Sequence, residues 1–134
     1  PPPPPGRGGG GLIRATLPAD AVDQTTTDPA AGWYLGRIGN IAWTQTPMTD
    51  VVLVAWQIAK PLCEAINMKL TGSTAIPDIA NTIPNVFIDE SRHSGSNAAT
   101  FDASDCAACE SMPALCVSDS GGTRFGYYSI IVNR

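Results

Sequence analysis

Apolar runs separated by polar and proline-containing segments predict a set of short β-strands. The runs lie at residues 12–17, 33–43, 51–58, 85–89 and 124–133. Four of the six residues from 51 to 56 are β-branched or aromatic, which favours a strand over a helix. Residues 40–43 and 51–56 flank a polar turn that contains Pro47, so we expect these two segments to pair as a hairpin.

The C-terminal segment RFGYYSIIVN, residues 124–133, shows the clearest strand pattern. It is apolar on both faces over residues 127–132, which predicts a central strand covered on both sides. Gly121 and Gly122 precede it and predict a turn. The polar residues 90–105 predict a loop.

Residues 60–70 predict a helix. Pro61 suits the first helical turn, where its missing N–H is not needed, and Gly72 follows as a stop signal. An alternative is one long helix over residues 50–70 with a kink at Pro61. The strand-forming residues before position 57 favour a strand followed by a helix.

Leu62, Ile66 and Leu70 recur at the spacing of one face of this helix. We expect this stripe to face the core with Cys63 beside it. Asn67 is expected to face outward or sideways.

The chain has 134 residues, which suits a single domain. Residues 1–11 are almost entirely proline and glycine and predict a flexible lead. Residues 12–134 are then one globular domain. The segment pattern predicts an α+β fold, in which a small antiparallel sheet packs on a short helix and long loops connect the elements.

Composition limits the classes of partner. Charged residues make up 15% of the chain and the formal net charge is −4, where about 25% charged residues is usual. No basic stripe is present, so we expect no nucleic-acid partner. No apolar run reaches the roughly 18 residues of a membrane span. Low charge with many Thr, Ser, Asn and Gly residues is typical of surface appendages, secreted domains and virion proteins.

The four cysteines indicate either a disulfide framework or a metal site with four thiolate ligands. They are Cys63, Cys106, Cys109 and Cys116. Structural zinc usually draws on two CxxC-type knuckles, and this chain has one. Acidic Asp105 and Glu110 flank that motif and would raise the pKa of a thiol, which argues against redox catalysis.

Disulfides are therefore the favoured interpretation, and they indicate an exported protein. Three pairings are possible. We expect a long bridge from Cys63 to the cluster and one local bridge, with Cys63–Cys106 and Cys109–Cys116 as the favoured pairs.

Other candidate sites carry weaker patterns. Asp102, Asp105 and Glu110 are candidate calcium ligands because their oxygens lie close in sequence, although a solvated acidic loop competes and no D-x-D-x-D-G pattern is present. His93 lies among serines without a G-x-S-x-G motif, so we expect no hydrolase, and no other enzymatic activity or cofactor is indicated. Trp33 and Tyr34 are candidates for partner binding.

Several short motifs carry a resemblance to a known class of protein. They are the Pro/Gly lead running into residues 8–12, WYLG at 33–36, Asp50 before an apolar run, LCEAIN at 62–67 followed by Leu70, and the tyrosines at 127–128 before a terminal Arg134. Together they resemble the C-terminal globular part of small pilin-like or pseudopilin-like proteins of Gram-negative, particularly alphaproteobacterial, type.

The resemblance implies an α+β head with an antiparallel sheet and disulfides in its C-terminal region. Its partners would be further copies or other pilin-like subunits. The apolar N-terminal helix that packs pilin subunits into a fibre is absent from the sequence, so we expect a head without its stalk.

These observations predict a non-enzymatic structural subunit that is extracellular, at the cell surface or periplasmic. Its role would be assembly of a surface filament or a secretion pseudopilus. Another virion or surface-layer structural protein and a zinc-bound binding module are the alternatives.

Overall fold

A computed structural model describes residues 13–18, 21–22, 30–38, 40–44, 50–88 and 100–132. The predicted lead, residues 1–11, lies outside the described residues. The elements in chain order are β1 (Ile13–Ala15), β2 (Gly32–Ile38), β3 (Asn40–Ile41), β4 (Asp50–Trp56), α1 (Lys60–Thr71), the π-helical turn η2 (Pro84–Ile88), β5 (Thr100–Phe101), the 3-10 turn η5 (Ala107–Cys109), β6 (Ala114–Ser118) and β7 (Phe125–Val132).

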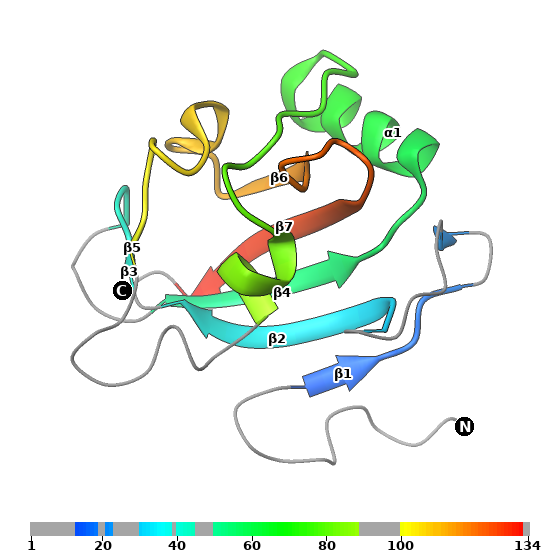
Figure 1. The fold of residues 1–134 in the computed structure, drawn as a ribbon, viewed down its shortest axis with the longest axis horizontal. Coiled ribbons are helices and arrows are strands. Elements are labelled where there is room, and N and C mark those ends of the chain that lie inside the picture. The colour runs from blue at the N-terminus through cyan, green and yellow to red at the C-terminus, as the bar shows by residue number, and fades with distance from the viewer. Residues whose placement is uncertain are drawn as a thin grey trace.

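The main sheet has five strands in the order β1-β2-β4-β7-β6, and every neighbouring pair is antiparallel. The short α1 lies against one end of it (Figure 1). The predicted α+β class, with an antiparallel sheet packed on a short helix and held by disulfides, is confirmed.

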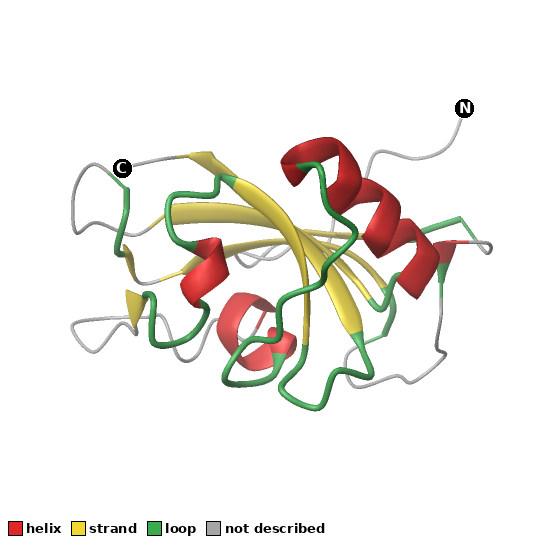
Figure 2. Ribbon diagram, turned by 90° about the horizontal axis from the view of Figure 1, so that it is seen from above, coloured by secondary structure: helices red, strands yellow, loops and turns green. Residues whose placement is uncertain are grey.

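The two faces of the sheet have different covers, because side chains alternate along each strand. One face carries the larger core, in which η2 and the segment around η5 cover buried residues such as Tyr34, Trp56 and Tyr128. The other face carries a smaller core around Cys63, Cys116 and α1. Figure 2 shows α1 above one part of the sheet and the two short helical turns on the opposite side.

The predicted hairpin between residues 40–43 and 51–56 is wrong. β4 pairs with β2 instead, with Gly32 opposite Trp56 and Ile38 opposite Asp50. β3 instead pairs in parallel with β5. The buried carboxylate of Asp50 accepts the backbone N–H of Ile41 at 2.9 Å and the hydroxyl of Thr44 at 3.0 Å. These bonds hold residues 41–44 away from the strand ladder.

The predicted helix is confirmed as α1, with Pro61 in its first turn and Gly72 ending it in the left-handed region at φ 82°. The predicted core stripe is wrong. Leu62 and Leu70 are 38% and 43% exposed, whereas Asn67 is fully buried beside Cys63. The helix is therefore turned so that Cys63 and Asn67, four residues apart, face the sheet.

Residues 85–88 of the segment predicted as a strand form the turn η2 instead. Val86, Phe87 and Ile88 are all buried, and this segment is not part of the sheet. The Ile83 N–H before this turn donates to the Asp119 carboxylate at 2.5 Å. Burial raises the pKa of Asp119, while this hydrogen bond and the charge of Arg124 oppose the shift.

The last strand is confirmed as β7, which lies inside the sheet between β4 and β6. Its first half is covered on both sides, since Phe125 and Tyr128 are buried on opposite faces. Ile131 is 50% exposed, so the prediction of full cover fails at the C-terminal end.

The outer edge of β6 is closed by side-chain and loop groups instead of another strand. The Asn67 amide donates to the Cys116 carbonyl oxygen at 2.7 Å and accepts the Cys116 N–H at 2.9 Å. The Ser118 N–H donates to the Pro77 carbonyl, and the Ser118 carbonyl accepts the Ile79 N–H, each at 2.9 Å. The backbone groups that an edge strand leaves free are thereby paired at both residues.

Candidate functional site

All four cysteines are paired in two disulfides. Cys63 on α1 is joined to Cys116 on β6, with Cα atoms 5.4 Å apart, and Cys106 is joined to Cys109 across η5, with Cα atoms 5.3 Å apart. No cysteine is free. The disulfide interpretation is confirmed, and the favoured pairing, Cys63–Cys106 with Cys109–Cys116, is wrong.

The pairing follows from the position of α1. This helix lies over β6, so Cys63 faces Cys116 and Asn67, one turn later, reaches the backbone of the same residue. Cys106 and Cys109 lie under the opposite face of the sheet. The sheet separates the two ends of the cysteine cluster, which sequence spacing could not show.

The disulfides bear on compartment and on metal binding. Disulfides of this kind persist in oxidising surroundings, outside the cell or in the periplasm. They also join the thiols that a four-thiolate zinc site would need. Within the described residues, no three His, Cys, Asp or Glu side chains come together as a possible metal site.

The candidate calcium ligands are engaged in a local turn. Asp102 accepts the N–H of Ser104 at 2.9 Å and its hydroxyl at 2.5 Å, and the hydrogen bonds from Ser104 lower the pKa of Asp102. Asp105 accepts the N–H of Asp102 at 3.0 Å. Glu110 is exposed and directly follows η5. These carboxylates shape the loop; a role as ligands stays a prediction. His93 lies outside the described residues.

Trp33 and Tyr34 point to opposite faces of β2. Tyr34 is 2% exposed in the larger core and donates its hydroxyl to the Ala30 carbonyl at 2.5 Å. The expectation that Tyr34 meets a partner is therefore corrected, because a strand places consecutive side chains on opposite sides. Trp33 lies half-buried on the other face, and partner binding by Trp33 stays a prediction.

A groove runs between α1 and the sheet, and we call it the α1 groove. Its volume is about 410 Å³. It is lined by Leu17, Trp33, Ala55, Ile58, Leu62, Ile66, Lys69, Leu70 and Tyr127. All but one of these residues are apolar or aromatic, and Lys69 carries the only charge.

The same face of the sheet continues beyond the groove along β2 and β4. Leu35 lies opposite Leu53, and Leu53 lies opposite Ser129. Leu35, Val51 and Leu53 are half-buried, and Ile131 is 50% exposed. We call these four residues the open face, since α1 packs over β6 and β7 and these residues keep part of their surface exposed.

Sequence reasoning missed the groove residues of α1 because it placed their apolar stripe in the core. One signal was available. Cys63 and Asn67 are four residues apart, and a disulfide at Cys63 would turn that side of the helix inward. The stripe of Leu62, Ile66 and Leu70 then lies at the side of the helix and forms a groove wall.

No protein-family model, curated protein or solved structure matches this chain. In the described part of the chain, no helix combines the length and the apolar character required to cross a membrane.

Proposed function

We propose that this chain is a non-enzymatic structural subunit that acts in the assembly of a surface filament or secretion pseudopilus, as a pilin-like or pseudopilin-like head domain. The open face is the observation that carries the proposal. A small domain that keeps an apolar sheet face accessible has a surface for packing against another polypeptide. The resemblance of the sequence motifs to pilin-like proteins supplies the type of assembly.

The two disulfides support the same proposal. An exported head of this size gains stability from cross-links, at about 2–4 kcal/mol each. Both bridges lie in the covered cores and leave the open face unaltered. The cross-linked domain thus keeps an accessible apolar surface through which it could pack against a neighbouring subunit.

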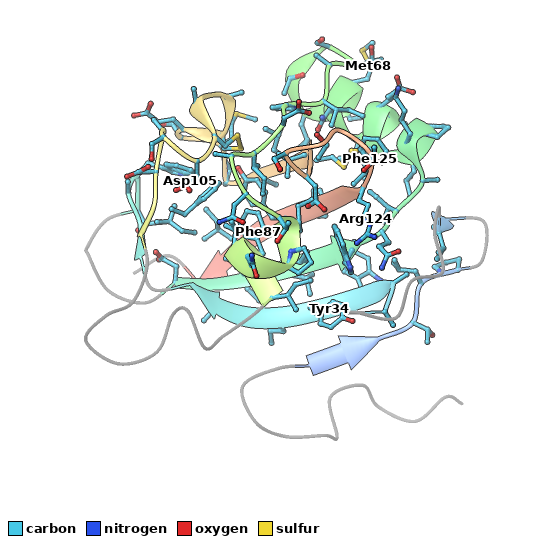
Figure 3. All side chains as sticks on the ribbon, viewed as in Figure 1. Tyr34, Met68, Phe87, Asp105, Arg124 and Phe125 are labelled. Carbon is cyan, nitrogen blue, oxygen red and sulfur yellow. A yellow bond between two sulfur atoms is a disulfide. The ribbon has the colours of Figure 1, made fainter. Side chains whose placement is uncertain are left out.

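A photo-cross-linking residue placed at Leu53 tests this proposal in the native cell. We expect the chain to be found in the sheared surface or periplasmic fraction, with cross-links to copies of itself or to other small subunits. The same residue at Met68, which is 48% exposed on the outer side of α1 (Figure 3), is the matched control and should give few cross-links. A protein that stays monomeric and unlinked from Leu53 would contradict the proposal.

A further inference from the structure

The floor of the α1 groove is a row of three residues across neighbouring strands. Trp33 lies opposite Ala55, and Ala55 lies opposite Tyr127. Ala55 is 3% exposed and lies beneath its two larger neighbours, so the half-buried Trp33 and Tyr127 form the accessible part of this floor.

The walls of the groove are also apolar. Leu62, Ile66 and Leu70 form the α1 side, and Leu17 and Ile58 complete the lining. Leu62 and Leu70 remain 38% and 43% exposed, so an occupant would cover apolar surface that now meets water. The volume of about 410 Å³ is in the range of about 300–1,000 Å³ that ligand sites occupy.

A single charged residue of the lining indicates how a ligand would be oriented in the groove. Lys69, in the last turn of α1, is the only charged residue of the lining. No ion pair engages it among the described residues. A ligand that fits this groove is thus apolar along its length and anionic at the end near Lys69.

We propose that the α1 groove binds an alkyl carboxylate, with the alkyl chain lying along the groove against Trp33, Tyr127 and the leucines of α1 and the carboxylate at Lys69. The proposal goes beyond filament assembly and does not depend on it, because the groove and the open face are separate parts of the surface. No bond is made or broken, so this is a binding site.

Decanoate added to the purified, oxidised chain tests the proposal by NMR. The chain has three tryptophans, and a Trp33→Phe variant assigns the indole N–H signal of Trp33. We expect decanoate to shift this signal and to leave that of Trp56, buried in the other core, unchanged. Octanoate, shorter by two methylenes, should bind about tenfold more weakly.

Matched variants separate the groove from the rest of the helix. Leu62→Glu and Met68→Glu both alter exposed positions of α1, but only Leu62 lines the groove. The first should weaken decanoate binding by at least about tenfold and the second should leave it unchanged. Lys69→Gln should weaken binding of decanoate by about two- to fivefold and not that of 1-decanol, whereas Lys60→Gln, outside the groove, should change neither.

The proposal would be overturned by an unchanged Trp33 signal at millimolar decanoate, by equal binding of decyltrimethylammonium, or by equal losses of binding in Leu62→Glu and Met68→Glu. Self-association of the purified chain that buries Trp33 and excludes decanoate would also overturn it, since a second copy would then be the occupant. None of these results depends on whether Leu53 cross-links to neighbouring subunits.

Discussion

Asn67 gives the strongest test of how the helix is held to the sheet. Its side chain is fully buried and makes three hydrogen bonds, two with the backbone of Cys116 and one, at 3.0 Å, to the Ala75 carbonyl. In an Asn67→Ala variant the buried N–H and C=O of Cys116 lose their partners. Each such group costs about 1–3 kcal/mol. The higher helix propensity of alanine offsets about 0.5 kcal/mol of this loss in stability. We therefore expect a loss of about 2–5 kcal/mol in the free energy of unfolding.

Urea unfolding without reductant measures this loss with both disulfides intact. Met68→Ala is the control on the same helix, where a side chain that is 48% exposed should change stability by about 0.5 kcal/mol or less. Asn67→Asp separates shape from hydrogen bonding, because it keeps the volume and the acceptor for the Cys116 N–H but removes the donor to the Cys116 carbonyl. We expect it to be destabilising at neutral pH.

A loss below about 1 kcal/mol in Asn67→Ala would refute this reasoning. It would mean that water reaches the Cys116 backbone once the amide is gone, so that the edge of β6 is less buried than the structure shows. A neutral Asn67→Asp would show that the donor bonds contribute little.

Three further predictions concern the cross-links, the acidic buried group and the close packing of one glycine. Peptide mapping without reduction should give Cys63 linked to Cys116 and Cys106 linked to Cys109, and a Cys63–Cys106 peptide would contradict the structure. Replacing both cysteines of a pair with serine should lower the free energy of unfolding, measured by denaturant titration. The expected loss is about 4 kcal/mol for Cys63–Cys116, which are 53 residues apart, and about 1.5 kcal/mol for Cys106–Cys109, which are three residues apart. Equal losses would contradict the explanation that each disulfide acts by restricting the unfolded chain. The pKa of Asp119 in the folded protein lies above 3.8, so the protonated carboxyl stabilises the fold below pH 3.8, and this stabilisation is lost as pH rises through the folded-state pKa. The free energy of unfolding of the wild type, measured relative to Asp119→Asn, should therefore fall as pH rises over that range. A rise would show that the pKa is shifted in the opposite direction. A Gly126→Ala variant places a Cβ 3.1 Å from Ile83 and 3.4 Å from the Ala55 carbonyl, so we expect a thermal-unfolding loss of about 1–3 kcal/mol, while Gly121→Ala, with its nearest atom at 3.8 Å, should be close to neutral.

Local sequence patterns predicted the positions of the helix and of two strands better than they predicted which segments pair with one another. The helix α1 was predicted from Pro61, Gly72 and its apolar spacing, and β4 and β7 from their β-branched and aromatic residues. These signals act within one element, so the sequence carries them in full. The segment at η2 failed because three consecutive buried residues fit a short strand and a tight turn equally well until their surroundings are known.

The candidate site is formed by contacts between segments that are distant in the sequence, and local sequence patterns do not predict such contacts. The disulfide pairing required knowing that α1 crosses β6, and the orientation of α1 required knowing that a polar residue, Asn67, is buried. Burial of asparagine is uncommon because its amide must find partners, and here those partners are backbone groups 49 residues away. The apolar stripe of α1 was therefore assigned to the core when it lines a groove.

The closed edge of β6 has a consequence for how the protein behaves in concentrated solution. An edge strand with unpaired N–H and C=O groups is a template on which another chain can add a strand. In this domain one amide side chain and a short loop occupy those groups at Cys116 and Ser118. Loss of Asn67 would unpair only the groups of Cys116 and leave those of Ser118 paired, so another chain could add a strand at this edge only after α1 moves away from β6.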